Sequence, residues 1–119
     1  MFTSINQSPT AEFLNGGLSF GAFTAVDLTG EGVVNSGASS LPLGILLSDN
    51  LDAESVTVQL SGGGYWRAGE SIAAGDFLSA GLSGVAMKST SGKFIFAQAL
   101  ENAAQGAAAH VQIIRAGKL

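Results

Sequence analysis

The chain has 119 residues, which is enough for one domain around a single hydrophobic core. It has no cysteine, which excludes a disulfide framework and a thiolate metal site, and its net charge of −4 without a basic cluster argues against a nucleic-acid partner. Only 12% of the residues are charged while 46% are hydrophobic, with a mean hydropathy of +0.37, so we expect an oligomer or a protein docked on another.

Residues 1–20 are predicted to form an extended N-terminal arm, followed by one folded domain over residues 21–119. Within the arm neither a strand nor a helix period is sustained, and isolated apolar residues stand among polar ones as anchors for a partner's surface: Phe2, Ile5, Phe13 and Leu14. A first strand with a frayed end is the alternative. The start lacks the regions of a signal peptide and no stretch approaches the ~20 apolar residues of a membrane helix, so we expect a soluble protein without a membrane partner.

Short strands are predicted from residue 20 onward. Phe20–Leu28 is rich in aromatic and β-favouring residues and leads into a turn at 29–32, after which Val33 begins another strand. Ile45–Leu47 and Val56–Leu60 are two further strands, joined by an acidic turn.

This hairpin is predicted to occur twice. A shift of 53 positions sets 44–60 on 97–113 without gaps, although only three positions are identical (Leu47 with Leu100, Val58 with Val111, Gln59 with Gln112). We interpret this as one hairpin design used twice in a single barrel or sandwich, with chance patterning of apolar residues as the alternative.

The second half of the chain continues in the same way. The three glycines at 62–64 predict a loop, Tyr65–Arg67 a strand, and Ile72 and Phe77–Leu78 core residues on either side of a tight turn. Further strands are predicted at 85–88 and 93–99, and turns recur every 8 to 12 residues or so. This spacing is typical of an all-β barrel or sandwich of short antiparallel strands. A turn is expected at 99–109, with a short helix as the alternative.

Charge is divided unevenly along the chain. Six acidic residues and no base precede Arg67, whereas five bases and three acids stand from Arg67 onward. If the two halves lie on different faces, neighbouring subunits could meet in complementary fashion. Alternatively, the halves interleave in one fold and the asymmetry cancels.

No catalytic or metal-ligand set is apparent, so we expect neither an enzyme nor a cofactor. His110 is the only histidine and shares its side of the strand with Gln112, which favours solvent or a subunit interface. Trp66 is interpreted as an anchor of the core or of a subunit interface. The closest approach to a calcium ligand set lacks the glycine and glutamate positions of an EF-hand loop and is interpreted as a solvated turn: Asp49, Asn50, Asp52 and Glu54.

A succession of sequence blocks is informative about the family. The blocks are Phe20–Asp27 leading into Gly30 and Gly32, Leu43–Leu46 followed by Asp52–Val58, Glu70–Leu78, and Ala97–Glu101 through Val111–Ile113. Their order over roughly residues 20–115 resembles the small capsid cement, or head decoration, proteins of tailed bacteriophages. The chain departs from that pattern at 53–55, where a glycine-acid pair commonly precedes the strand.

The resemblance implies a β-barrel-like fold and a non-enzymatic role in the virion. A protein of this family binds the outside of an assembled capsid, with the major capsid protein as partner, often as a homotrimer. The arm residues Phe2, Ile5, Phe13 and Leu14 are the expected capsid contact, and Trp66 and His110 the expected oligomer interface. Many weak contacts on a closed lattice bridge capsomers and stabilise the shell. The alternative function is a carbohydrate- or ligand-binding surface module centred on Trp66.

Overall fold

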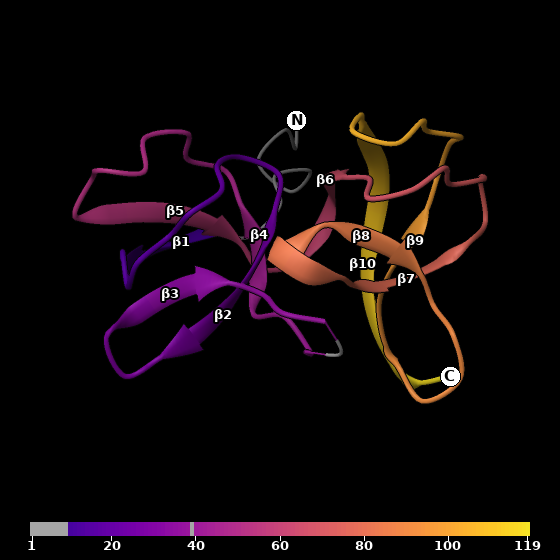
Figure 1. Ribbon diagram of the computed structural model, residues 1–119, viewed down its shortest axis with the longest axis horizontal. Helices are drawn as coiled ribbons and strands as arrows, with labels where there is room; N and C mark the ends of the chain where they lie inside the picture. The colour runs from indigo at the N-terminus through magenta and orange to yellow at the C-terminus, as the bar shows by residue number, and fades with distance from the viewer. Residues whose placement is uncertain (1–9, 39) are drawn as a thin grey trace, which may run out of the picture.

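Ten β-strands make up most of the regular structure in the computed structural model, which describes residues 10–38 and 40–119 (Figure 1). They are β1 (Thr10–Leu14), β2 (Ala25–Thr29), β3 (Gly32–Asn35), β4 (Gly44–Leu46), β5 (Ser55–Gln59), β6 (Gly62–Arg67), β7 (Phe77–Ala80), β8 (Ala86–Lys88), β9 (Phe94–Ala99) and β10 (Ala108–Lys118). A 3₁₀ turn, η2 (Leu82–Gly84), precedes β8. In this part of the chain there is no helix of the length and apolar character that a membrane span requires.

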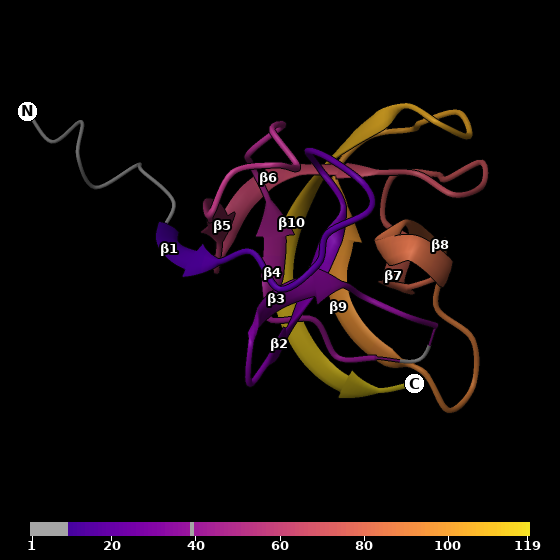
Figure 2. The ribbon, with the colours of Figure 1, turned by 60° about the vertical axis from the view of Figure 1, so that its left-hand side comes forward.

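The strands form two antiparallel sheets of five strands each, which confirms the all-β prediction as a sandwich rather than a closed barrel. Strands β1 to β5 make one sheet and β6 to β10 the other, so each half of the chain builds its own sheet. Figure 1 shows the first sheet on the left and the second on the right, and Figure 2 shows how strongly the second sheet curves. The two halves of the sequence therefore do not interleave.

The two sheets have the same topology. Their strand orders are β1-β5-β4-β2-β3 and β6-β10-β9-β7-β8, which become identical when five is added to each label of the first. The cross-strand pairs of the predicted hairpin recur 53 positions later. These pairs are Ile45 with Gln59 and Leu46 with Val58, then Gln98 with Gln112 and Ala99 with Val111. The prediction of one hairpin used twice is confirmed.

The correspondence extends beyond the hairpin. Asn15 forms a parallel bridge with Val33, and Ala68, 53 positions later, forms one with Ala86. In both places the next residue donates its backbone N–H to the carbonyl of the bridged residue, at 2.9 and 2.8 Å. Chance patterning does not reproduce registers and bridges along a whole chain. We call residues 10–59, without residue 39, the N-terminal unit and residues 62–119 the C-terminal unit.

Two hydrophobic clusters form the core. The smaller lies in the N-terminal unit and contains Leu18, Val26, Val33, Leu46, Val56 and Val58. The larger is built around Trp66 and Phe96 of the C-terminal unit but also includes Ala25 and Ile45 of the N-terminal unit. The cores of the two units are therefore joined by apolar side chains from strands β2 and β4.

The predicted loop at 61–64 is wrong, because Gly62, Gly63 and Gly64 begin strand β6 and pair with β10. The buried side chain of Gln59 explains the difference: its Nε2 donates to the carbonyls of Ser61 (3.0 Å) and Gly63 (2.6 Å). A Cβ on Gly64 would overlap this amide. The side chain of Gln59 therefore fills the space beside the glycines of β6. Composition alone does not reveal this contact.

Residues 10–20 of the predicted arm belong to the folded body. Strand β1 pairs with β5 along its length, and Oδ1 of Asn15 accepts the backbone N–H groups of Gly17 (2.9 Å) and Leu18 (3.0 Å). Leu18 is buried. The alternative of a first strand therefore holds from residue 10. The remaining arm, residues 1–9 with Phe2 and Ile5, lies outside the described residues.

The structure also tests the predicted strand over Phe20–Leu28 and the predicted turn or short helix at 99–109. The strand predicted over Phe20–Leu28 begins only at Ala25, because the chain turns at Phe23, whose φ is +70°. The segment 100–107 connects β9 to β10 as turns and loop rather than a helix. Ala103 in this segment bridges Ile72, which is what holds it against the neighbouring loop.

Candidate contact surface

The outward side of the C-terminal sheet carries a row of uncharged side chains. In antiparallel pairs, residues directly opposite each other share a face of the sheet. The registers place Phe77 opposite Gln98, Gln98 opposite Gln112, and His110 opposite Tyr65. His110 and Gln112 share a face because a strand alternates with period two. Arg67, opposite Ala108, lies at the end of the same side, and we call the five residues beyond it the uncharged face: Tyr65, Phe77, Gln98, His110 and Gln112.

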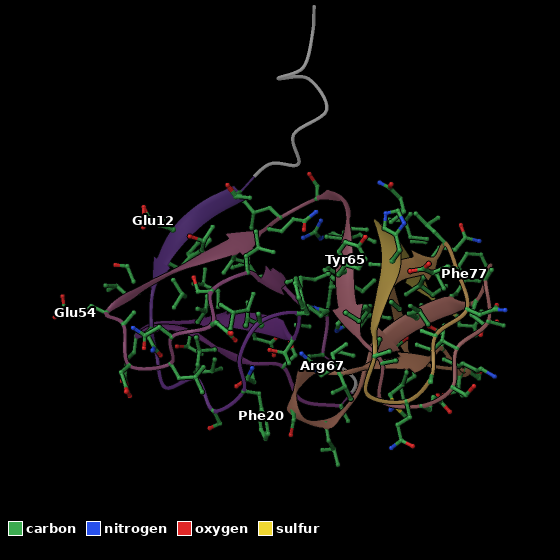
Figure 3. All side chains as sticks on the ribbon, turned by 90° about the horizontal axis from the view of Figure 1, so that it is seen from above. Glu12, Phe20, Glu54, Tyr65, Arg67 and Phe77 are labelled. Carbon is green, nitrogen blue, oxygen red and sulfur yellow. The ribbon has the colours of Figure 1, made fainter. Side chains whose placement is uncertain are left out.

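The uncharged face exposes large apolar groups to solvent. Tyr65 is 46% exposed and Phe77 is 44% exposed, and Figure 3 labels both in the C-terminal unit. Between them lie the amides of Gln98 and Gln112 and the imidazole of His110. Outward faces of antiparallel sheets are ordinarily polar, so aromatic groups among neutral polar ones make this face a candidate contact surface.

His110 stands on this face, as its predicted interface role requires. Its ring stacks on Tyr65 with centroids 5.2 Å apart and an interplanar angle of 26°. Its backbone N–H donates to Oε1 of Glu101 (3.2 Å). Phe23 of the N-terminal unit meets the same tyrosine edge to face, with ring centroids 6.0 Å apart. The aromatic group thus spans both units.

Trp66 does not lie at the surface. It has no exposed area, packs against Phe96 in a T-shaped arrangement at 5.3 Å, and donates its Nε1–H to the carbonyl of Gly84 (2.8 Å). The alternation of β6 turns Tyr65 outward and Trp66 inward, so the core interpretation of Trp66 replaces its placement at an oligomer interface. The same burial removes Trp66 as the centre of a sugar-binding platform.

The described residues of the predicted capsid contact divide into two kinds. Phe13 is half-buried and packs against the core of the N-terminal unit. Leu14 is 63% exposed at the end of edge strand β1. Leu14 is therefore the described anchor that a partner can reach.

Charge is separated in space as it is in sequence. All six acids that precede Arg67 in the sequence fall in the N-terminal unit, whereas the C-terminal unit has five bases and three acids. Figure 3 shows Glu12 and Glu54 at the end of the molecule opposite Phe77. The molecule therefore has an acidic end and a weakly basic end.

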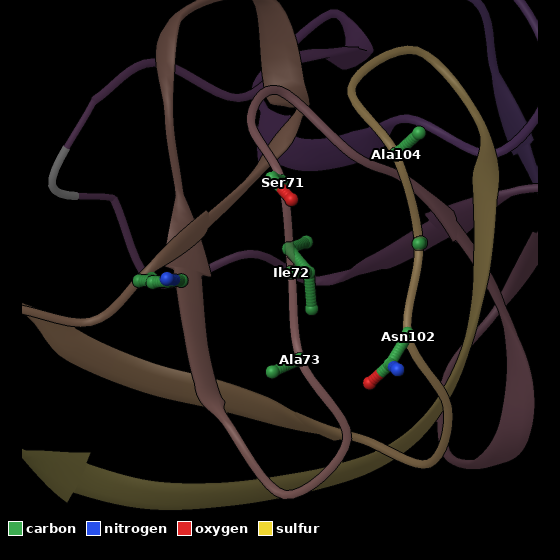
Figure 4. A pocket seen from close by; sticks show the side chains of 7 residues that line it. Ser71, Ile72, Ala73, Asn102 and Ala104 are labelled. Atoms are coloured by element: carbon green, nitrogen blue, oxygen red, sulfur yellow. The ribbon is translucent and has the colours of Figure 1, made fainter.

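A shallow hollow lies between two loops of the C-terminal unit (Figure 4). Its walls are Ser71–Ala73 on one loop and Asn102–Ala104 on the other, and its volume is about 450 Å³. The loops are tied by the Ile72 N–H, which donates to the carbonyl of Ala103 (2.8 Å). Lys88 is the charged group in its lining, beside the polar side chains of Ser71 and Asn102.

A smaller hollow of about 230 Å³ lies at the seam between the two units. Phe20, Asp49, Arg67 and Ser83 contribute to its lining, and Figure 3 labels Phe20 and Arg67 there. Asp49 is engaged with the neighbouring loop, since its Oδ1 accepts the N–H of Ala22 (3.3 Å).

The acidic turn of the first hairpin joins β4 to β5 as expected. Within it, Oδ1 of Asn50 accepts the backbone N–H of Asp52 (3.0 Å). Across residues 10–38 and 40–119, no three histidine, cysteine or carboxylate side chains gather closely enough to hold a metal ion.

Sequence reasoning missed most of the uncharged face. It placed Phe77 in the core beside Leu78 and Ile72, of which only the latter two are buried. The face could have been found from the period of two in 63–67, continued into 108–112, had the glycines been counted as strand. Cross-strand neighbours such as Gln98 require the register, which only the fold supplies.

Comparisons with known proteins identify the fold. No family model and no curated protein matches the chain. Among solved structures, the N base of head fibre gp8.5 in bacteriophage phi29 is similar over 93% of this chain and 98% of that chain, with a TM-score of 0.76 and 19% sequence identity. The two proteins share a fold.

Proposed function

We propose that this chain is a structural protein of a phage virion that binds the outer surface of the assembled capsid. The observation that carries the proposal is the shared fold with the N base of a phage head fibre, along nearly the whole of both chains. The resemblance of its sequence blocks to capsid cement proteins points to the same class of protein. The major capsid protein is the proposed partner and a homotrimer the proposed state.

The chemistry of the surface supports a binding role without catalysis. A chain with 12% charged residues and an exposed face of aromatic and amide groups is suited to broad, weak contacts. Such contacts become strong when many copies engage one closed lattice. By bridging neighbouring capsomers, the bound protein would oppose internal pressure on the shell.

Cosedimentation with empty capsid shells tests the proposal. The full chain is expected to pellet with shells and to raise their melting temperature. Deletion of residues 1–9, which precede β1, is expected to weaken binding and leave the fold intact, because β1, the first strand of the described residues, begins at Thr10. Leu14→Ser is expected to weaken binding too, whereas Leu82→Ser, at an exposed leucine of η2, serves as the matched control. A full chain that stays in the supernatant at all concentrations would refute capsid binding.

A ligand-binding module is the second candidate, and the exposed Tyr65 favours it. Its ring, with His110 and Phe23 beside it, is an exposed aromatic group that a sugar could reach. Binding of the isolated protein to a glycan array, lost in Tyr65→Ala, together with no cosedimentation, would reverse the ranking.

A further inference from the structure

The junction between the two units covers one edge strand of the molecule. The N–H of Arg67, on edge strand β6, donates to the carbonyl of Phe23 (2.7 Å), and the ring of Phe23 meets Tyr65. Ala25 and Ile45 are paired across β2 and β4, pack in the cluster of the C-terminal unit and have no exposed area. The outward side of the N-terminal sheet therefore lies against the C-terminal unit at β6.

The repeat gives this covering side a counterpart in the C-terminal unit. Strand β4 corresponds to β9 at a shift of 53 positions and β2 to β7 at a shift of 52, so the pair of Ala25 and Ile45 becomes Phe77 and Gln98. Both counterparts belong to the uncharged face, where Phe77 is 44% exposed. The C-terminal unit thus presents to solvent the side that the N-terminal unit uses to cover β6.

The covered strand β6 also has a counterpart, which is β1. Strand β1 is likewise the edge of its sheet, and Leu14, at the position of Arg67, is 63% exposed. The N–H of Asn15 donates to the carbonyl of Glu54 (2.8 Å), in line with the ladder between β1 and β5. Because hydrogen-bonded pairs alternate in an antiparallel ladder, the backbone N–H of Leu14 points away from β5. It is directed toward the open edge, as that of Arg67 is directed toward Phe23.

The hydrophobic cluster behind β1 is less completely covered than the cluster behind β6. Trp66 and Ile113 are buried, whereas their counterparts 53 positions earlier, Phe13 and Leu60, are only half-buried. The larger cluster takes in apolar side chains from the other unit, but every described member of the smaller cluster precedes β6. An apolar side chain from outside would complete the smaller cluster at β1.

We propose that a second copy of the chain repeats the junction, with Gly75 and Phe77 of its C-terminal unit against Phe13 and Leu14 on β1 of the first copy. Gly75 is the counterpart of Phe23 at the same shift of 52 positions. In this contact the N–H of Leu14 donates to the carbonyl of Gly75. That carbonyl accepts Nε2 of Gln98 (3.1 Å) within its own copy, and a carbonyl oxygen has a lone pair for each of two donors.

Side-chain sizes support the pairing. Within the chain, the small Ala25 belongs to the same cluster as the large Trp66. At the equivalent positions of the proposed contact, Ala25 is replaced by the larger Phe77 and Trp66 by the smaller Phe13. The two changes compensate in volume, which close packing at an apolar contact requires.

The proposed contact joins opposite ends of the molecule, since Figure 3 shows Glu12 of β1 at one end and Phe77 at the other. The acidic end of one copy meets the weakly basic unit of the next, which favours this orientation. Contacts between two different surfaces are heterologous and close into a ring when the rotation between copies allows it. A three-membered ring agrees with the homotrimer, and in this respect the inference rests on the proposed function.

Engineered cysteines test the contact directly, because the chain has none of its own. Leu14→Cys and Gly75→Cys are made as separate full-length variants and mixed with oxidised glutathione. The disulfide between the two variants is expected to form about tenfold faster than either homodisulfide, because the contact raises the effective concentration of one thiol near the other.

Gly92→Cys replaces Gly75→Cys as the matched control. Both glycines have positive φ, +91° at Gly75 and +87° at Gly92, and a Cβ at either meets nothing within 4 Å. The two substitutions therefore strain the backbone alike and differ in whether the thiol lies in the contact. Equal rates of disulfide formation with Leu14→Cys for both glycine variants would overturn the proposal.

Removal of the apolar side chains tests the contact by analytical ultracentrifugation. Leu14→Ser and Phe77→Ser are each expected to weaken self-association about tenfold or more, because each removes apolar area buried between copies. Leu82→Ser, at a leucine of η2 that is 76% exposed and lies outside the contact, is expected to have little effect. Equal weakening by all three variants, or a parent chain that is monomeric at every concentration, would overturn the contact.

The two proposals fail in distinguishable ways. If the chain cosediments with shells but the cysteine pair at positions 14 and 75 is not favoured, this contact is wrong and capsid binding stands. If the cysteine pair forms selectively and no shell is bound, the contact stands and the proposed function is wrong.

Discussion

Phe23 and Gly75 occupy equivalent positions in the two units. Their backbone N–H groups donate to the equivalent carbonyls of Leu46 (2.7 Å) and Ala99 (2.8 Å), and both have positive φ, +70° and +91°. Glycine adopts this conformation freely, whereas a bulky L-residue is strained in it. The N-terminal unit therefore keeps a phenyl ring at a position suited to glycine, and that ring contacts Tyr65 of the other unit.

Two substitutions of Phe23 separate the strain from the ring contact. Phe23→Ala and Phe23→Gly both lose the ring, but only glycine relieves the backbone, so the alanine variant is expected to be less stable by about 1 kcal/mol. Urea denaturation followed by Trp66 fluorescence measures the difference. Gly75→Ala is the control: a Cβ there meets nothing within 4 Å, so its cost of about 1 kcal/mol would be strain alone. Equal stability of all three variants would contradict the backbone strain assigned to a non-glycine residue at these positions.

Trp66 offers a second test at the scale of one residue. Trp66→Phe removes the indole donor and leaves the buried carbonyl of Gly84 without its partner, which is expected to cost about 1–3 kcal/mol. The oligomeric state of the folded variant, measured by light scattering, is expected to equal that of the parent chain, because the indole is covered within one molecule. If a folded Trp66→Phe variant dissociated, Trp66 would contribute to a subunit interface after all.

At the scale of strands, the repeat places identical residues in unlike surroundings. Gln59 and Gln112 are 53 positions apart and are each opposed by their counterpart residue, Ile45 or Gln98. Gln59 is nevertheless buried and bonded to two carbonyls of the glycine segment, while Gln112 is exposed on the uncharged face. A repeated residue type therefore does not imply a repeated role.

The two glutamines form a matched pair for mutation. Gln59→Leu leaves the carbonyls of Ser61 and Gly63 without the amide donor and is expected to cost about 1–3 kcal/mol. Gln112→Leu changes an exposed position and is expected to stay within about 0.5 kcal/mol of the parent chain. Thermal unfolding of both variants makes the comparison, and a larger loss in Gln112→Leu would contradict it.

The strands differ in how far the sequence could predict them. The hairpin from Gly44 was predictable because its alternation is regular and its pattern recurs, and the structure gives both copies the same register. The glycines of β6 were not, since what packs them is Gln59 rather than their own side chains. Alternation showed that Tyr65 and Trp66 face opposite ways, but only the fold shows which side is the core. The strand β1 from residue 10 was not predicted either, because it is defined by its pairing with β5.

At the scale of the whole molecule, the two units share a core. Ile45 lies in the N-terminal sheet but packs in the larger cluster of the C-terminal unit, whereas its neighbour Leu46 packs in the smaller cluster. Neither side chain is exposed. The sequence shows the two clusters as patterns but not their junction, which depends on contacts far apart in the chain.

The shared core predicts cooperative unfolding. Ile45→Ala and Leu46→Ala are each expected to cost about 2–5 kcal/mol. In both variants, hydrogen exchange measured by mass spectrometry is expected to accelerate in both sheets together, because the units unfold as one. Acceleration confined to β1–β5 in Leu46→Ala would show instead that the units open separately.

The repeated design also has a consequence for symmetry. Three such chains around an axis would carry six five-stranded units of one topology, alternately acidic and weakly basic. In this ring the two units of each chain would be joined covalently by the link between β5 and β6, whereas units of neighbouring chains would meet through non-covalent contacts. A threefold assembly of this protein could then match an array with six nearly equal positions while retaining only three identical attachment points.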